Sequence, residues 1–320
     1  MKVLFCGRIF AQAPVFLAKA LPTDEIVSCD TLDAPAQSVD ADVLIPLMTP
    51  ITRSIIEGSG AGLIQQWGVG LEGVDIGYAT EKGVRVCNVP GDVTYNADST
   101  AEHAIFLMMA LARRMNEFGA SFESNSWGSP TGRSLFEARA LIVGLGRVGR
   151  ALARKLKALG MLVQAISRDG RIPEEDKPYV DSVGKLSDLL NLSREADFVI
   201  STTSLNDQTR GLFDSRLFNS MRDTAFVINV SRGPVVIDAD LLEALSTGKI
   251  AGAGLDVFST EPFSANRDLL ASPKVVASPH IAGVTIQNYI GICSVVAENI
   301  KRLKEFRPLQ FCANFSDTEI

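Results

Sequence analysis

LIVGLGRVGRALARKLKALG, residues 141–160, joins an apolar run to an amphipathic segment through three closely spaced glycines. Gly144, Gly146 and Gly149 stand in the spacing G-x-G-x-x-G, which is a weak signal alone because glycines also mark ordinary turns. Here the apolar run predicts a strand, and the segment after the glycines predicts a helix that stops at Gly160. A strand, a tight turn and a helix in this order predict an anion site at the helix N-terminus.

Each position of this turn has a physical task. Gly144 permits the tight turn, Gly146 lets the backbone approach a pyrophosphate, and Gly149 lets the helix pack closely on the strand. Arg147 and Val148 begin the helix, where free N–H groups and the helix dipole favour an anion. These five residues are therefore predicted to bind the pyrophosphate of a dinucleotide.

The end of the next predicted strand, VQAISRDG at 163–170, indicates which dinucleotide is preferred. An NAD site usually carries Asp or Glu here, whose carboxylate accepts hydrogen bonds from the ribose hydroxyls. This chain has Ser167 and Arg168 instead, which can donate to a 2′-phosphate and balance its charge. Asp169 remains open as a slightly displaced ribose acceptor, although Asp-Gly is also ordinary turn chemistry. We predict NADP(H) as the preferred cofactor, with NAD(H) as the alternative.

Apolar runs alternate with helical segments along most of the 320 residues, which predicts an α/β protein with parallel sheets. Five runs lie within residues 1–90 and six lie within 140–279. The later runs are apolar without interruption, which is typical of strands buried on both faces of a sheet. A helical segment at about 285–305 is too long to be another unit of the second sheet, so it is expected to return to the N-terminal region.

The segment between the two groups of runs predicts a helix and then a loop. Residues 97–118 predict a long helix, with Asp98 or Ser99 as its N-cap. Its centre is apolar on nearly all sides, so we expect it to be buried between domains or subunits. Residues 121–139 are polar and rich in Gly and Ser, which predicts a surface excursion.

Composition argues against several classes of function. The net charge of −6 disfavours a general binder of nucleic acid or anionic membrane, and no apolar run reaches the roughly 18–20 residues of a membrane span. The start, MKVLFCGRIF, predicts a first strand and lacks the long apolar region of a signal peptide. Five cysteines without a C-x-x-C spacing and only two histidines predict reduced thiols, a cytoplasmic location and no metal site.

Three polar stretches follow later apolar runs, namely NVSRGPVVID (229–238), GLDVFSTEPF (254–263) and SPHIAG (278–283). In an open α/β sheet ligands bind at the carboxyl ends of the strands, so all three stretches can reach one cleft. They carry Arg232, Glu261 and His280, a set that suits a 2-keto acid. The Arg binds a carboxylate, the His donates a proton to the ketone oxygen, and the Glu favours the charged form of the His.

Over about residues 40–300 the chain resembles the D-isomer-specific 2-hydroxyacid dehydrogenases, which include glyoxylate/hydroxypyruvate reductases and phosphoglycerate dehydrogenase. Five motifs carry this resemblance, in the order and at the intervals of the family. They are VGLEGVD (69–75), GLGRVGR (144–150), NVSRG (229–233), GLDVF with the following EP (254–262), and SPHIAG (278–283).

The resemblance implies roles for individual residues. Arg232 binds and orients the substrate carboxylate, His280 is the acid/base, and Glu261 pairs with His280. Asp256 holds the nicotinamide carboxamide. Thr202 follows the third coenzyme strand, in a loop that approaches the cofactor, and is expected to contribute to cofactor binding. Many relatives have His-x-Pro-Leu there, so the contact with the cofactor is expected to differ in this chain.

The family fold also implies two Rossmann-like domains. Residues 1–95 and 286–320 form a smaller, discontinuous, flavodoxin-like substrate-binding domain, and residues 96–285 form a central doubly wound coenzyme domain. In the first domain, backbone N–H groups around Val69 and Gly70 complete the cradle for the substrate carboxylate. Relatives usually dimerise through the coenzyme domain, so a homodimer is expected.

The sequence therefore predicts an NADP(H)-preferring D-2-hydroxyacid dehydrogenase that reduces a small 2-keto acid such as glyoxylate or hydroxypyruvate. Hydride would reach the keto carbon while His280 protonates the oxygen. Two alternatives stay open. One is a dinucleotide-sensing binding protein, like the corepressors that resemble this family and keep the Arg–Glu–His set. The other is a formate- or phosphite-type dehydrogenase.

Overall fold

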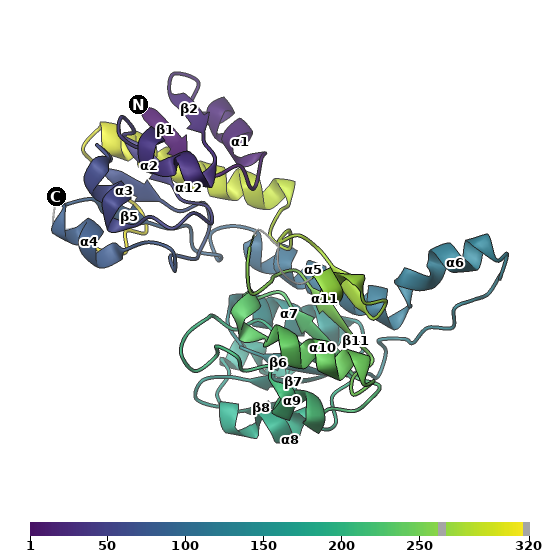
Figure 1. The fold of residues 1–320 in the computed structure, drawn as a ribbon. Coiled ribbons are helices and arrows are strands. Elements are labelled where there is room, and N and C mark those ends of the chain that lie inside the picture. Colours follow the sequence, from purple (N-terminus) through teal and green to yellow (C-terminus); the bar gives the residue numbers. More distant parts are fainter. Residues whose placement is uncertain (262–266, 316–320) are drawn as a thin grey trace. The chain divides into compact units, whose positions relative to one another are not determined.

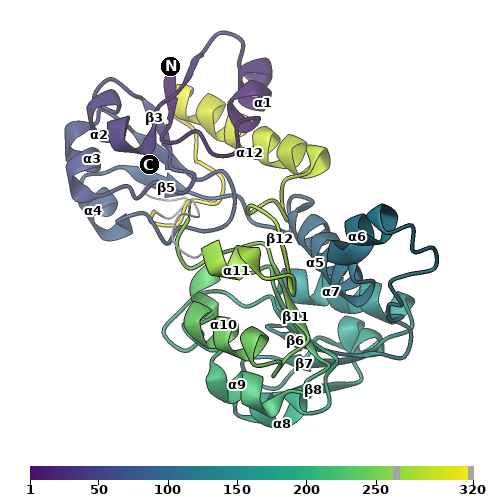
Figure 2. The ribbon, with the colours of Figure 1, turned by 45° about the vertical axis from the view of Figure 1, so that its right-hand side comes forward.

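The computed structural model describes residues 1–261 and 267–315 (Figures 1 and 2). The chain divides into two compact units, which we call the terminal unit (Met1–Tyr95 with Val284–Ile320) and the central unit (Asn96–Gly283). The chain passes from the central unit back into the terminal unit between Gly283 and Val284, two residues before the boundary expected from the sequence. Each unit carries its own parallel sheet with helices on both faces, which confirms the predicted fold class.

The terminal unit is built on a five-stranded parallel sheet in the order β2-β1-β3-β4-β5. Its strands are β1 (Lys2–Phe5), β2 (Glu25–Ser28), β3 (Val43–Ile45), β4 (Leu63–Gln65) and β5 (Arg85–Cys87). All five strands lie within the apolar runs predicted from the sequence. The inner strands are mainly apolar because their side chains are buried on both faces of the sheet. The strand order is that of flavodoxin-like folds.

Helices cover both faces of this sheet. On one face, α1 (Ala13–Ala20) and α12 (Ile286–Lys304) share a hydrophobic core with β1 and β3. In Figure 1 the yellow α12 therefore lies among purple elements from the start of the chain, as expected for the helical segment near 285–305. The other face carries α2 (Ala34–Gln37), α3 (Arg53–Gly58) and α4 (Ile76–Glu81).

The central unit is built on a seven-stranded parallel sheet in the order β12-β11-β10-β9-β6-β7-β8. Its strands are β6 (Arg139–Val143), β7 (Leu162–Ile166), β8 (Ser182–Gly184), β9 (Phe198–Ser201), β10 (Phe226–Asn229), β11 (Gly252–Leu255) and β12 (Val275–Ala277). This is the doubly wound order, which reverses between β6 and β9. The sequence predicts six of these strands and misses β8, because β8 is a three-residue edge strand without an apolar run.

Helices also cover both faces of the central sheet. α5 (Asn96–Ala112) and α7 (Arg147–Ala158) lie on one face. The opposite face carries α8 (Leu189–Ser193), α9 (Ser215–Ser220), α10 (Asp238–Ser246) and α11 (Arg267–Ala271). Short 3-10 turns occur at Thr31–Asp33, Met115–Glu117, Glu174–Tyr179, Leu186–Asp188 and Gly233–Val235.

The start of α5 corrects the predicted N-cap. The helix begins at Asn96, so Asp98 and Ser99 both lie inside it and neither caps it. The Asp98 carboxylate instead lies 2.9 Å from the Lys155 ammonium of α7. Ser99 is buried. Asp98, which the sequence predicted as an N-cap, therefore forms an ion pair between the packed helices α5 and α7 instead.

α5 also ends earlier than predicted, and part of its surface is exposed where burial was expected. α5 stops at Ala112, because Arg114 adopts a left-handed conformation (φ 56°) that a helix cannot continue through. Phe106 and Met109 remain 47% and 41% exposed in the chain as described. The predicted surface excursion at 121–139 includes the last turn of a helix, α6 (Phe118–Glu123), which stands away from the sheet in Figure 1.

Candidate active site

The glycine turn after β6 has the geometry of a dinucleotide phosphate site. Gly144 has φ +106°, and a Cβ there would lie 2.7 Å from backbone atoms of Thr203. A Cβ on Gly149 would lie 2.1 Å from the Gly144 carbonyl oxygen, so helix and strand approach this closely only with glycine. A Cβ on Gly146 would meet nothing within 4 Å, which leaves open space beside the backbone. The turn therefore fits the pyrophosphate of a nicotinamide dinucleotide.

The helix that follows this turn offers backbone donors. α7 begins at Arg147, and its N-cap residue, Gly146, has no side chain to take up the first N–H groups, which include that of Val148. These N–H groups and the helix dipole suit an anion. Thr202 Oγ1 donates to the Gly144 carbonyl oxygen at 2.6 Å, so this side chain supports the turn from the end of β9.

The end of β7 forms a tight turn beside an exposed guanidinium. Asp169 Oδ1 accepts a hydrogen bond from the Arg171 N–H at 3.2 Å, and Gly170 has φ +72°. Ser167 Oγ donates to the Arg171 carbonyl oxygen at 2.8 Å. Arg168 is exposed, and no group within the described ranges pairs with its side chain. The Asp169 carboxylate is thus engaged in its own turn, whereas the Arg168 charge faces solvent.

Glu261 and His280 form a direct pair at the ends of β11 and β12. Glu261 Oε2 lies 2.6 Å from His280 Nδ1, and Glu261 Oε1 accepts from the Phe258 N–H at 2.8 Å. The carboxylate therefore holds the Nδ1–H of the imidazole, and proton exchange with a substrate would use Nε2. His280 has φ +55°, and its N–H donates to the Asp256 carbonyl oxygen at 2.8 Å, which stabilises this rare backbone conformation.

Arg232 joins the same cluster through close backbone packing. It follows β10, and a Cβ on the adjacent Gly233 would overlap the Phe258 carbonyl oxygen at 1.7 Å. Phe258 is the residue whose N–H donates to Glu261. Asn229 Nδ2, at the end of β10, donates to the Arg232 carbonyl oxygen at 3.1 Å. The loops that carry the three candidate catalytic residues therefore meet at one edge of the sheet. Pro262, the last residue of the GLDVF–EP motif, lies outside the described residues.

Asp256 anchors the loop that carries His280. Its carboxylate is almost fully buried and accepts three hydrogen bonds. The donors are Ser278 Oγ at 2.6 Å, the Ile281 N–H at 2.8 Å and the Ala282 N–H at 2.9 Å. Asp256 thus fixes the chain on both sides of the histidine, and its contact with a nicotinamide carboxamide stays a prediction.

His103 supports this anchor from α5. His103 Nε2 lies 2.7 Å from Ser278 Oγ and 3.4 Å from Asp256 Oδ1. Because Ser278 Oγ donates to Asp256, it accepts from His103, so Nε2 carries the ring proton. Burial lowers the pKa of His103 below its ordinary value, although the Asp256 charge opposes this shift. The ring is therefore a neutral donor near pH 7.

Sequence reasoning missed these supporting residues. Asn229 Oδ1 accepts from both the N–H and the Oγ of Ser231, and Ser231 Oγ lies 2.7 Å from Ser201 Oγ of β9. Asn229, Ser201 and Ser278 all stand at or just after the last position of an apolar run. A polar residue at that position of a buried strand was the available signal, because a buried polar group needs a partner.

In the terminal unit, Val69 and Gly70 follow β4 and have their carbonyl groups held by side chains. Asn88 Nδ2 donates to the Val69 oxygen at 2.8 Å, and Gln66 Nε2 donates to the Gly70 oxygen at 2.7 Å. The N–H groups of Val69 and Gly70 donate to no group in the described part of the chain. Two oriented and unused N–H groups suit an anionic ligand.

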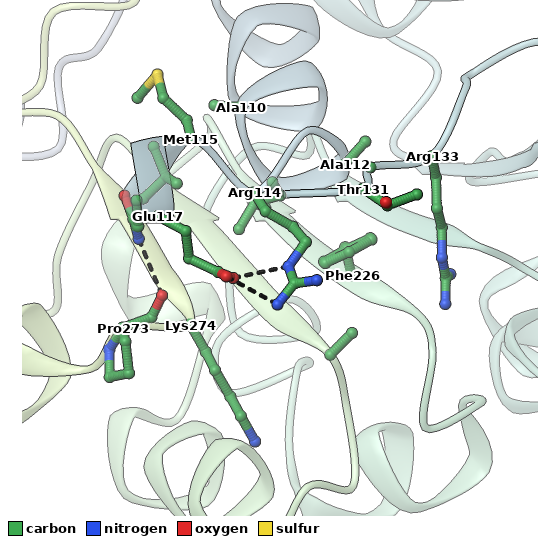
Figure 3. A pocket seen from close by; sticks show the side chains of 15 residues that line it. Ala110, Ala112, Arg114, Met115, Glu117, Thr131, Arg133, Phe226, Pro273 and Lys274 are labelled. Carbon is green, nitrogen blue, oxygen red and sulfur yellow. Dashed lines mark hydrogen bonds and ion pairs between the residues drawn. The ribbon is translucent and has the colours of Figure 1, made fainter. Parts of the chain in front are cut away.

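A hollow of about 400 Å³ lies at the opposite edge of the central sheet (Figure 3). Phe226 begins β10 and Lys274 immediately precedes β12, so this hollow lies where the strands start. Figure 3 shows Arg114 and Glu117 beside it, with guanidinium–carboxylate distances of 2.7 and 2.8 Å. Ligands of open α/β sheets bind where the strands end, so the hollow is not the candidate active site.

Two further searches bear on cofactors and location. Over residues 1–261 and 267–315, no group of three or more His, Cys, Asp and Glu side chains is placed to hold a metal ion. None of the helices described is both long and apolar enough to cross a membrane.

Known proteins resemble this chain closely. A family profile described as "D-isomer specific 2-hydroxyacid dehydrogenase, NAD binding domain" matches residues 105–282. The D-3-phosphoglycerate dehydrogenase of Archaeoglobus fulgidus is 34% identical over 326 aligned positions, which cover 100% of this chain and 60% of that relative. The human glyoxylate reductase/hydroxypyruvate reductase is 33% identical over 314 positions, 94% of each chain. The crystal structure of the TT0316 protein from Thermus thermophilus matches with a TM-score of 0.83 at 28% identity, over 98% of this chain and 100% of that one.

Proposed function

Because this chain belongs to the D-isomer-specific 2-hydroxyacid dehydrogenase family, a family of nicotinamide-dependent oxidoreductases, we propose that it is an NADP(H)-preferring reductase of small 2-keto acids. Glyoxylate and hydroxypyruvate are the first candidate substrates, since the human relative is named for them. The observation that carries the proposal is the Glu261–His280 pair, which lies beside the Arg232 loop at the edge where ligands of this fold bind.

His280 is the proposed acid/base. Glu261 holds Nδ1 at 2.6 Å, which fixes the ring orientation and balances the positive charge of the protonated ring. In the reductive direction, Nε2–H donates its proton to the carbonyl oxygen of the keto acid. In the oxidative direction, Nε2 accepts the proton of the hydroxyl group. When bound, a nicotinamide would supply the hydride for reduction or accept it in oxidation.

Arg232 and two backbone amides are proposed to bind the substrate carboxylate. A guanidinium pairs with a carboxylate through two parallel hydrogen bonds, which orients a small acid as well as binding it. Arg232 Nη1 donates to the Ser231 carbonyl oxygen at 2.9 Å, so part of the guanidinium is already held in place. In the terminal unit, the unused N–H groups of Val69 and Gly70 support the same role.

The proposed cofactor preference rests on the turn after β7. Arg168 is exposed and unpaired within the described residues, and Asp169 accepts from its own turn. An exposed guanidinium beside the adenosine ribose position attracts a 2′-phosphate, whereas a free carboxylate would repel it. Ser167 Oγ must leave the Arg171 carbonyl oxygen to donate to that phosphate. Gly144, Gly146 and Gly149 would hold the pyrophosphate of either cofactor.

The deciding experiment measures initial rates with glyoxylate and hydroxypyruvate, with NADPH and NADH side by side. We expect turnover with both cofactors and a kcat/KM at least about tenfold higher with NADPH, because one charge-assisted hydrogen bond is worth that much. Higher kcat/KM with NADH would keep the enzyme and overturn the assignment of Arg168. No turnover with either cofactor across a panel of 2-keto acids would overturn the reductase.

We further propose that the central unit forms a homodimer. Phe122 and Trp127 of the α6 segment are 74% and 83% exposed, with ring centroids 6.4 Å apart. Exposed apolar groups of this size mark interaction surfaces. Sedimentation of the wild type should give twice the mass of the chain, and a Phe122→Ser, Trp127→Ser variant should sediment as a monomer. A monomeric wild type at micromolar concentration would refute the dimer.

A cytoplasmic location remains part of the proposal. Its support is that all five cysteines of the chain are free thiols in the structure. Fractionation of cells that produce the protein with a tag would test the location directly.

A further inference from the structure

The C-terminal segment of the terminal unit covers the outer edge of β5. Cys87 of β5 and Cys312 of this segment form an antiparallel bridge pair. Two backbone hydrogen bonds flank the pair, from the Asn88 N–H to the Phe311 oxygen at 3.3 Å and from the Ala313 N–H to the Val86 oxygen at 2.7 Å. An uncovered edge strand is prone to pair with other chains, so this short cover completes the sheet.

The backbone holds these two cysteines in the register that a disulfide requires. The flanking residues make the hydrogen bonds, so Cys87 and Cys312 are a non-hydrogen-bonded pair. In such a pair the Cα atoms are about 4.5 Å apart and the side chains lie on the same face. A disulfide needs a Cα separation of about 4.4–6.8 Å. Both side chains accordingly belong to the same core, beneath α1 and α12.

The two thiols differ in acidity and in access to solvent. The hydrogen bond with Cys87 lowers the pKa of Cys312, and the same bond, together with burial, raises the pKa of Cys87. Cys87 is fully buried, whereas Cys312 is partly exposed. Cys312 Sγ also donates to Asn314 Oδ1 at 3.4 Å. Exposure decides the roles: an oxidant from solvent reaches Cys312 first, and the buried Cys87 lies opposite it to resolve the product.

We propose that Cys87 and Cys312 are a redox modification site, which closes into a disulfide and locks the C-terminal segment onto β5. With hydrogen peroxide as oxidant, the Cys312 thiolate attacks one peroxide oxygen, forms a sulfenic acid and releases hydroxide. The Cys87 sulfur then attacks the Cys312 sulfur, the S–S bond forms, and water leaves with the Cys87 proton. Overall, two thiols and one peroxide give one disulfide and two waters. The site does not depend on the proposed enzymatic activity.

A second pair of cysteines provides an internal control. Cys6 and Cys29 directly follow the neighbouring parallel strands β1 and β2, and the Cys29 N–H donates to the Phe5 carbonyl oxygen at 3.1 Å. Burial raises the pKa of Cys6 to about 12 and raises that of Cys29. Protonated thiols without solvent access react slowly, so this pair is expected to stay reduced.

The test treats the native full chain with hydrogen peroxide, blocks remaining thiols after denaturation, and maps disulfides in non-reduced peptides by mass spectrometry. Wild type should lose two of its five thiols. The map should join residues 87 and 312, and dithiothreitol should reverse the link. Exchange of the Ala313 amide with solvent deuterium should slow at least about tenfold on oxidation, because the cover can no longer detach.

Two serine variants complete the design. Cys312→Ser should keep all its thiols under the same treatment, whereas the matched control Cys29→Ser should still lose two. The proposal is overturned by retention of five thiols in wild type, or by a link between residues 6 and 29. Irreversible oxygen addition to Cys312 without a link would overturn it as well.

Discussion

Two regions at the same edge of the central sheet differ in how far the chain itself fixes their side chains. At the ends of β10, β11 and β12, Glu261 and His280 are 2.6 Å apart, and Asp256 accepts three hydrogen bonds within the same loops. At the end of β7, Arg168 is exposed and no described group pairs with it. Contacts within the chain therefore orient Glu261 and His280 before any ligand binds, whereas no such contact orients Arg168, the residue proposed to select the cofactor.

This difference predicts where substitutions should act. A preorganised group contributes mainly to the transition state, because no ordering cost remains when the reaction occurs. An exposed guanidinium that nothing holds in place contributes mainly to binding, and it loses side-chain entropy when it engages a phosphate. Changes at the first region should therefore lower kcat, and changes at the second should raise the KM of one cofactor.

The largest effect is expected for His280→Asn. Asn tolerates the left-handed backbone of this position better than Ala does, so the loop should keep its fold. Without a proton donor at the keto oxygen, kcat should fall at least about a thousandfold, and the KM for the cofactor should stay nearly unchanged. Steady-state rates with matched thermal unfolding provide the measurement. A variant that keeps a tenth of the wild-type kcat would show that His280 is not the acid/base.

A smaller effect is expected for Arg168→Ala. The KM for NADPH should rise about tenfold or more, and the KM for NADH should change by less than about twofold, since only the 2′-phosphate contact is lost. Arg194→Ala is a matched control, because it removes an equal exposed charge just before the chain enters β9, at the opposite sheet edge. Equal loss for both cofactors would mean that Arg168 supports the turn rather than the phosphate.

The same two regions show how far the sequence alone could lead. Strands buried on both faces are unbroken apolar runs, so six strands of the central sheet were predictable and the edge strand β8 was not. The parallel order then placed the loops of Arg232, Glu261 and His280 at one edge. Residue types sufficed there to propose roles for these side chains, because an acid, a base and a carboxylate binder are chemically distinctive.

The supporting contacts could not be predicted in the same way. His103 and Ser278 are 175 residues apart, and a helical pattern shows which face of α5 is buried but not what it meets. The N-cap prediction at Asp98 was wrong for a related reason, since Lys155 of another helix uses that carboxylate. The conformation and contacts of such side chains depend on partners that are distant in sequence, and a single sequence does not reveal those partners.

A still smaller effect is expected for the support behind His280. His103→Leu should remove the donor to Ser278 and lower kcat about threefold to tenfold, while His103→Gln, which keeps an N–H, should lose less. Ser278→Ala should match His103→Leu, and the double variant should lose little more than either single one, because the residues act as one chain of hydrogen bonds. If the losses of the two single variants add up in the double variant, or if thermal stability falls without any change in kcat, His103 contributes only packing.

The smallest effect is a pH dependence of stability. Burial lowers the pKa of His103 below its ordinary value, with the Asp256 charge opposing, so the unfolded chain binds this proton more tightly than the folded chain. The stability contributed by neutral His103 is thus complete above about pH 6.5 and is lost as the pH falls through the folded pKa. His103→Gln does not titrate, so between pH 7.5 and 5.5 its Tm should fall less than that of wild type, by on the order of 2 °C. Parallel falls in the two proteins would mean that folding does not shift the pKa of His103. A smaller fall in wild type than in the variant would mean that the folded chain holds the ring protonated, and that an ion pair with Asp256, not a neutral hydrogen bond, holds the loop.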